Sequence, residues 1–276
     1  MTMTEERDGI ADYRFVRRLG AGSHGVFYLA HPPKRLPVAA EFVAVKVLSG
    51  GSSQDVFRWA HRELAAFAAV QSPYLVTLYD AGQQGDEVYY SMEYLPAGSL
   101  AQPAQPPGRA WSLAAMAQAA RATHALHEAG IAHRDIKPGN VLLHSEGGKL
   151  ADLGLSHVLK PGITITGMGP AGDIGYVDPH LIRGDRPSRA SDVFSLGATL
   201  HYALAGQGLY GELPAADPLL AMRRVVSHPP VIAETLDPQA REIIAWAITP
   251  NPADRPATAL DLAERIEDLA QAPVPD

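Results

Sequence analysis

A change in residue pattern across a proline-rich segment constrains the fold of this chain more than any other feature. Residues 101–108 read AQPAQPPG, and proline lacks an amide hydrogen and clashes with the preceding helical turn, so neither a helix nor an inner strand is expected there. A strand-rich region precedes this segment and a mainly helical region follows it. We therefore predict an α+β chain with a small antiparallel sheet lobe, one main helix in that lobe, and a larger helical lobe.

The first region is rich in β-branched and aromatic residues separated by turn formers, a pattern typical of antiparallel strands. One stretch within it instead spaces its apolar residues as a helix does, and it ends at Gln71-Ser72-Pro73. The strands are predicted over Tyr13–Ala30, Glu41–Leu48, Tyr74–Ala81 and Val88–Tyr94, with a turn at Gly82–Asp86 and the helix over Asp55–Val70.

The second region repeats apolar residues at intervals of three and four, which predicts helices. These cover Trp111–Ala129, Val193–Ala205, Pro218–Ser227, Pro238–Ile248 and Ala257–Ala270. We expect an N-terminal extension over 1–12, the sheet lobe over 13–95, the helical lobe over 96–270 and a frayed tail over 271–276.

Composition excludes several functions. The 23 basic and 30 acidic residues give a net charge of −7, which argues against a nucleic-acid partner, because such domains usually carry a basic face. The absence of cysteine excludes disulfides, thiolate metal sites and a cysteine nucleophile. The longest apolar run, Leu64–Val70, is too short for a membrane segment, and no signal peptide is visible, so we expect a cytoplasmic protein.

A glycine-rich run, Leu19-Gly20-Ala21-Gly22-Ser23-His24-Gly25-Val26-Phe27, lies between two predicted strands. Glycines let backbone amides approach phosphate oxygens, but a strand follows where a dinucleotide fold needs a helix. Lys46 sits in an apolar strand shortly afterwards, and Glu63 of the predicted helix is a candidate partner for it. Glu63 taken alone is equally well explained as a solvated helix charge.

The most specific segment is His133-Arg134-Asp135-Ile136-Lys137-Pro138-Gly139-Asn140, followed by a short apolar strand and Asp152-Leu153-Gly154. Asp135 offers a base for an attacking hydroxyl, and Lys137 offers a cation for a transferring phosphoryl group. Asn140 and Asp152 are hard oxygen ligands suited to Mg²⁺. Phosphoryl transfer needs these parts and little covalent chemistry.

Together these motifs resemble the eukaryotic-type Ser/Thr protein kinase family, including its bacterial members, over about residues 13–269. The resemblance implies a bilobal fold with ATP and Mg²⁺ or Mn²⁺ as cofactors, protein substrates, and autophosphorylation that a homodimer would carry out in trans. It assigns catalysis to Asp135, Lys137 and Lys46, and metal binding to Asn140 and Asp152. It assigns nucleotide contacts to Leu19, Gly20, Gly22, Ser23, Gly25, Phe27, Ala44, Lys46, Glu63, Met92, Glu93, Leu95 and Leu142. It assigns structural roles to His133, Arg134, Asp192 and Arg255, and regulatory phosphorylation to Thr164 or Thr166.

Two departures from the family pattern weaken this interpretation. Asp173 replaces the usual threonine near the catalytic aspartate, which would place two repelling carboxylates together. Either Lys137 compensates, or Asp173 points elsewhere, or acceptor binding is impaired. His180 replaces the closing glutamate of the activation segment, so Arg255 loses its expected partner unless Asp178 substitutes. One alternative is therefore a pseudokinase that binds nucleotide without transferring phosphate. A second is a small-molecule phosphotransferase, because such enzymes share the catalytic aspartate and the metal ligands. The remaining histidines, His127 among them, are read as surface or packed residues.

Overall fold

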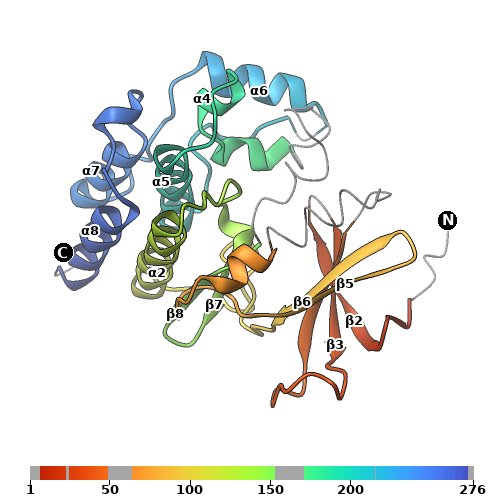
Figure 1. Ribbon diagram of the computed structural model, residues 1–276. Helices are drawn as coiled ribbons and strands as arrows, with labels where there is room; N and C mark the ends of the chain where they lie inside the picture. The colour runs from red at the N-terminus through yellow and green to blue at the C-terminus, as the bar shows by residue number, and fades with distance from the viewer. Residues whose placement is uncertain (1–6, 23–24, 49–63, 153–170, 215, 273–276) are drawn as a thin grey trace. The chain divides into compact units, whose positions relative to one another are not determined.

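The computed structural model describes residues 7–22, 25–48, 64–152, 171–214 and 216–272 (Figure 1). Of these, 7–22, 25–48, 64–69 and 76–94 form one compact unit, here called the strand unit. The helical unit contains 70–75 and the described residues from Leu95 onward. The main division therefore falls between Tyr94 and Leu95, beside the sequence-based boundary at 95.

The strand unit is built on a six-stranded antiparallel sheet with the order β1-β2-β3-β4-β6-β5. Alternate side chains of the central strand β4 face opposite sides, as strand geometry requires. Val43, Val45 and Val47 enter the apolar core, and Lys46 points to the other face. The strands are β1 (Gly9–Ile10), β2 (Tyr13–Gly22), β3 (Gly25–His31), β4 (Val43–Leu48), β5 (Leu78–Gln84) and β6 (Glu87–Glu93).

In the helical unit, the long helix α2 packs against α5, α8 and a short antiparallel hairpin (Figure 1). Its elements include the hairpin strands β7 (Val141–His144) and β8 (Gly147–Leu150) and the helices α2 (Arg109–Glu128), α4 (Pro179–Ile182), α5 (Arg189–Ala205), α6 (Pro218–Ser227), α7 (Pro238–Ala247) and α8 (Ala259–Gln271). Short 3₁₀-helices cover η1 (Pro138–Asn140), η3 (Ala171–Tyr176) and η4 (Pro252–Asp254). None of the helices in the described ranges is long and apolar enough to cross a membrane.

Local capping explains where the helices begin and end. Ser188 and Thr258 each form a capping box with the residue three positions later, which starts α5 and α8. Helix α5 therefore begins four residues earlier than its apolar pattern predicts. The expected stop after α2 is confirmed at Gly130, whose φ of 76° is left-handed.

The predicted hairpin in the strand unit has the wrong boundaries. Strand β5 begins at Leu78, because Tyr74 and Leu75 instead pair with Leu150 of β8 in the helical unit. The strand then continues through Gly82 to Gln84, and the turn is a tight one at Gly85-Asp86. Strand β1, within the predicted extension, was not expected. Of the predicted helix over Asp55–Val70, residues 64–69 are helical and 55–63 lie outside the described residues.

A buried histidine of α5 makes the stability of the helical unit pH-dependent. His201 is fully buried, and its Nε2 accepts a hydrogen bond from the Ala233 amide at 3.0 Å. Burial lowers its pKa below the ordinary 6.5, so the unfolded chain binds more protons under acid conditions. This contribution to stability is therefore complete above pH 6.5 and is lost as the pH falls below it.

We expect His201→Gln, which keeps a hydrogen-bond acceptor but does not titrate, to reduce this pH dependence. Between pH 7.5 and 5.5 the parent should lose about 1 kcal/mol more unfolding free energy than the variant. Urea titrations followed by tryptophan fluorescence at both pH values measure the difference. Equal losses in the two proteins would show that His201 does not titrate in this range.

Candidate functional site

A buried carboxylate fixes the segment that contains the expected base. Asp192 of α5 accepts hydrogen bonds from the backbone amides of His133 and Arg134 at 2.8 and 2.9 Å, and it pairs with His127 Nε2 at 2.8 Å. Asp192 and His127 are both about 1% exposed. Arg134 has a φ of 70°, a backbone conformation that non-glycine residues rarely adopt. The paired amides hold this turn in place, so the loop after it has a defined direction.

His133 connects the base to the strand that leads to Asp152. Its ring is fully buried, and burial lowers its pKa, so the neutral form is favoured. Nδ1 accepts a hydrogen bond from the Asp135 amide at 3.3 Å, and Nε2 donates to the carbonyl of Ala151 at 3.1 Å. These two bonds assign the proton to Nε2. His133 thus links the backbone of Asp135, the expected base, to the residue before Asp152, an expected metal ligand.

The carboxylate of Asp135 is held by an amide and by an ammonium group. Asn140 Nδ2 donates to the backbone carbonyl of Asp135 at 2.7 Å and to its Oδ2 at 2.9 Å. Lys137 Nζ lies 3.1 Å from the same Oδ2. Asn140 is positioned by the 3₁₀-turn η1, which begins at Pro138. The carboxylate therefore has a fixed orientation before any substrate binds.

The residues expected to bind a metal fit a hard cation. Because Asn140 Nδ2 is directed at Asp135, the amide oxygen Oδ1 is left to act as a ligand. The Ala151 amide donates to the Asn140 carbonyl at 2.8 Å, which places the backbone next to Asp152 beside this turn. Within the described ranges, no group of three or more His, Cys, Asp or Glu residues could hold a metal by itself. Such a donor set suits Mg²⁺, which keeps waters and binds substrate phosphates.

Lys137 lies between two carboxylates. Its Nζ is 2.8 Å from Asp173 Oδ2 of η3, in addition to the 3.1 Å contact with Asp135. Burial alone would lower the pKa of Lys137, but the two carboxylates outweigh it and raise the pKa well above its usual value. Of the alternatives open for Asp173, the structure shows the one in which Lys137 compensates the second negative charge.

The strand unit positions the expected phosphate-binding lysine on the face of the sheet opposite the core. Lys46 is only 2% exposed, and its Nζ lies 4.9 Å from the ring centroid of Phe27, its cross-strand neighbour on β3. A cation over an aromatic face is stabilised by the ring quadrupole. Gly25 must remain glycine, because a Cβ there would lie 2.3 Å from the carbonyl oxygen of Val47. At Gly20 the same atom would meet nothing within 4 Å.

The other residues expected to contact nucleotide divide between the two units. Ala44 and Met92 are buried and pair in register between β4 and β6, and Glu93 ends β6. Leu19 and Gly22 belong to β2, while Leu95 and Leu142 belong to the helical unit. Four expected residues, Ser23, Glu63, Thr164 and Thr166, lie outside the described residues, as does the predicted Lys46–Glu63 pair.

Comparison with known proteins identifies the family of the chain. The family model described as "Protein kinase domain" matches residues 13–267. The chain belongs to the protein kinase family.

Curated relatives of the chain are named serine/threonine-protein kinases. PknK of Mycobacterium tuberculosis is 33% identical over 267 residues, covering 94% of this chain and 24% of PknK. PknL of the same species is 31% identical over 242 residues, covering 83% and 59%. AfsK of Streptomyces griseus is 32% identical over 224 residues, covering 78% and 27%. The chain therefore spans less than two thirds of the length of each of these kinases.

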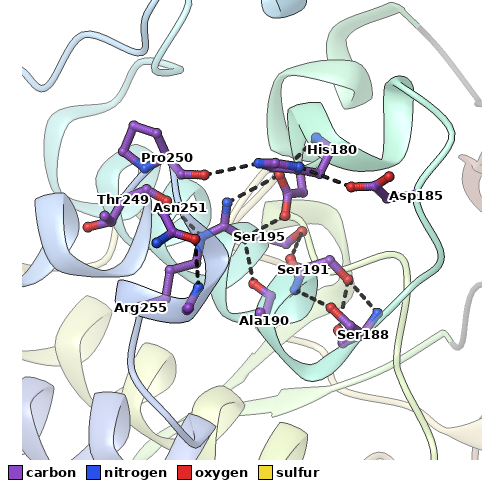
Figure 2. A network of polar contacts seen from close by, with 12 residues as sticks. His180, Asp185, Ser188, Ala190, Ser191, Ser195, Thr249, Pro250, Asn251 and Arg255 are labelled. Atoms are coloured by element: carbon purple, nitrogen blue, oxygen red, sulfur yellow. Dashed lines mark hydrogen bonds and ion pairs between the residues drawn. The ribbon is translucent and has the colours of Figure 1, made fainter.

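The kinase-family arginine near the C-terminus keeps an anionic partner despite the loss of the usual glutamate. Arg255 forms a buried ion pair with both oxygens of Asp178, and the two side chains are 1% and 2% exposed. Its remaining donors bind the carbonyls of Thr249 at 2.8 Å and Ala190 at 2.9 Å (Figure 2). Asp178 therefore substitutes for the missing glutamate, which was the open alternative.

His180, at the usual glutamate position, makes different contacts. Its ring lies between the Asp185 carboxylate and the Pro250 carbonyl, 3.0 Å from each (Figure 2). Its backbone amide donates to Asp178 Oδ1 at 3.1 Å, so Asp178 also caps α4. His180 thus connects the start of α4 to the segment before Arg255 without taking part in the ion pair.

Sequence reasoning missed one residue of this site. His127 was expected to be a surface or packed residue, but its Nε2 is bonded to Asp192. The two residues are 65 positions apart, and no local spacing signal connects them. The packing of α2 against α5 brings them together.

The Arg255–Asp178 ion pair can be tested by moving the carboxylate from position 178 to position 180. Asp178→Ala should reduce the unfolding free energy by about 3 kcal/mol, because it leaves a buried guanidinium without a counter-ion. Adding His180→Glu restores the family arrangement and should recover part of that loss. Thermal and urea unfolding of the parent, the single variant and the double variant measure this. A double variant no more stable than Asp178→Ala would show that a carboxylate at position 180 cannot reach Arg255.

A second test concerns the Lys137 bridge. Asp173→Thr keeps an oxygen acceptor for Lys137 and should change the kcat of peptide phosphorylation by less than about threefold. Asp173→Ala removes that acceptor and should lower kcat by about tenfold, about 1.4 kcal/mol in barrier. Steady-state kinetics with one acceptor peptide compare them. An increase in rate with Asp173→Thr would instead show that the extra carboxylate impairs acceptor binding.

Proposed function

We propose that this chain is an ATP- and Mg²⁺-dependent serine/threonine protein kinase that transfers the γ-phosphoryl group of ATP to a protein hydroxyl. The observation that carries the proposal is the Asp135 carboxylate, which Asn140 and Lys137 hold at 2.9 and 3.1 Å. A general base needs a fixed direction toward the proton it accepts. The relatives named as serine/threonine-protein kinases support the same function.

In the proposed reaction, Asp135 orients the acceptor hydroxyl and accepts its proton. A bond forms between the hydroxyl oxygen and the γ-phosphorus, and the bond from that phosphorus to the bridging oxygen of ADP breaks. Lys137 stands next to Asp135 and provides positive charge for the transferring group. Because the transition state is largely dissociative, positioning and charge carry most of the catalysis.

Asn140 and Asp152 are the proposed metal ligands, with Mg²⁺ or Mn²⁺ as the ion. The ion would neutralise charge on the nucleotide phosphates. Asn140 contributes its amide oxygen, since its nitrogen binds Asp135. The same residue would thus orient the base and hold the metal.

In the strand unit, we assign phosphate binding to Lys46 and to the glycines of β2 and β3. The buried ammonium group of Lys46 and the open space at Gly20 support this assignment. Met92, Glu93 and Leu95 are the proposed adenine-contacting residues, and Glu63 is the proposed partner of Lys46. These assignments follow the family motifs position by position.

We also propose control by phosphorylation of Thr164 or Thr166. Arg134 Nε is buried and makes no hydrogen bond with any residue in the described part of the chain. A phosphate group has the charge and geometry to pair with such a guanidinium. Autophosphorylation would then take place between two copies of the chain.

A nucleotide-binding module without transfer is the alternative that Asp173 and His180 suggested. The comparisons give it no support. Asp173 pairs with Lys137, His180 contacts Asp185 and Pro250, and Asp178 pairs with Arg255 in place of the usual glutamate. We therefore retain the kinase as the proposed function.

The test is transfer of labelled phosphate from ATP with Mg²⁺ to the chain itself and to a generic basic protein. We expect Asp135→Asn to lower the rate at least 100-fold, because the base is lost, and Lys46→Ala to lower it by a similar factor. Mass spectrometry of the labelled parent would locate the acceptor residues.

Nucleotide binding is the control for these variants. Asp135→Asn should bind ATP as the parent does, since its change affects the acceptor side. A parent that binds ATP but transfers no label would overturn the proposal in favour of the nucleotide-binding module. Label retained by Asp135→Asn would show that another group acts as the base.

A further inference from the structure

Five of the eleven arginines of the helical unit are matched by an acidic or aromatic side chain, and four of the other six lie in two neighbouring segments. Ion pairs or ring contacts engage Arg109, Arg121, Arg189, Arg255 and Arg265. In contrast, no acidic residue in the described ranges forms an ion pair with Arg183, Arg186, Arg223 or Arg224. All four are exposed. Four exposed arginines without an ion pair therefore lie in two segments of a chain that is acidic overall.

The four arginines come from segments that pack together. Arg183 ends α4, and its Nη2 donates to the carbonyl of Val226 at the end of α6, at 3.1 Å. Arg186 follows three residues later, and Arg223 and Arg224 lie on α6 itself. Helix α6 also packs against η3, which contains Asp173 (Figure 1). The cluster thus adjoins the element that contacts catalytic Lys137.

The local charge differs in sign from that of the whole chain. Residues 181–189 and 218–228 contain five arginines and a single acidic residue, Asp185, while the chain as a whole has a net charge of −7. Asp185 faces the ring of His180. The nearest acidic residue before α6 is Asp217, which caps the opposite end of that helix from Arg223 and Arg224. A cluster of this kind attracts acidic groups and accelerates their association.

Helix α6 adds apolar surface next to the arginines. Ala221 and Val225 are buried and hold the helix against the unit. Leu219 and Leu220 are 58% and 48% exposed, and each stands four positions before an arginine. Residues four apart lie on the same side of a helix. The outer side of α6 therefore presents one apolar turn followed by one basic turn.

We propose that this α4–α6 surface, formed by Arg183, Arg186, Leu219, Leu220, Arg223 and Arg224, binds an acidic segment of the protein substrate that also contains apolar residues. The inference rests on the proposed kinase function and names the class of substrate. Acidic side chains match the arginines, and apolar side chains match the leucines. Charge complementarity of this kind determines partner choice and association rate.

A protein segment fits this surface better than nucleic acid does. Exposed leucines offer nothing to a phosphate backbone, and the rest of the chain is acidic and would repel it. A second copy of the chain is the alternative protein partner for this surface, and the experiment below distinguishes it from a substrate. The segment need not contain the phosphorylated hydroxyl, because the surface is distinct from Asp135.

The probe is a fluorescent 12-residue peptide with two leucines followed by four glutamates and no hydroxyl residue. Its matched control has the glutamates replaced by glutamine. Fluorescence anisotropy with the full chain and no ATP measures binding independently of transfer. We expect the acidic peptide to bind at least tenfold more tightly than the control, and its affinity to fall as salt increases.

Variants of the chain test whether binding takes place at this surface. Arg223→Gln with Arg224→Gln should weaken binding of the acidic peptide about tenfold, and Leu219→Ala with Leu220→Ala should weaken it several-fold. Arg241→Gln removes an exposed arginine of α7 and should leave binding within twofold of the parent. Equal binding by the parent and the arginine double variant, or equal binding of the two peptides, overturns the proposal.

Transfer assays then separate this proposal from the proposed function. With the acidic segment attached to an acceptor peptide, the arginine double variant should raise KM about tenfold and leave kcat within twofold. Peptide binding without transfer by the parent refutes the kinase function but keeps the acidic-binding surface. Sedimentation that shows a parent dimer, a monomeric double variant and no peptide binding assigns the surface to self-association and overturns the proposal.

Discussion

The buried carboxylate of Asp192 is the interaction on which the candidate site depends. A charge removed from water is costly unless hydrogen bonds replace its solvation. Asp192 meets this condition with two backbone amides and His127. Those amides hold Arg134 in a left-handed conformation that its side chain does not favour. The direction of the chain through His133 and Asp135 follows from this contact, so α5 determines where the base points.

The ion pair of Arg255 shows that an interaction can persist while its residues change. A buried guanidinium needs an anion as well as acceptors for its other donors, and Asp178, Thr249 and Ala190 supply them. Asp178 stands two positions before the position of the usual glutamate. The Asp178 side chain also caps α4. The physical requirement, one buried anion facing Arg255, is thus met by a different position, and His180 is left to join α4 to Pro250.

The sequence was sufficient to predict the five longer helices of the helical unit within a few residues, because their apolar residues repeat at helical spacing. The sequence also predicted that Asp135, Lys137 and Asn140 share one site, because these residues lie close together in the chain. Prediction from the sequence failed where contacts between segments far apart in the chain determine the structure. The start of β5 depends on Leu75, which belongs to the helical unit and pairs there with Leu150. The role of His127 depends on how α2 packs against α5. The sequence left more than one arrangement open for Asp173 and for Asp178, and only the folded chain selects one.

The departures from the family pattern share an electrostatic logic. At each departure an aspartate stands within reach of a cation that is mostly buried. Asp178 faces Arg255, and Asp173 faces Lys137, whose second contact is Asp135. An unpaired cation costs most free energy in the interior, where water cannot screen it. The two aspartates are placed beside such cations. The arginines of α4 and α6 are exposed, so leaving them unmatched costs the fold little. The proposed acidic partner would supply the negative charge that these arginines do not meet within the fold.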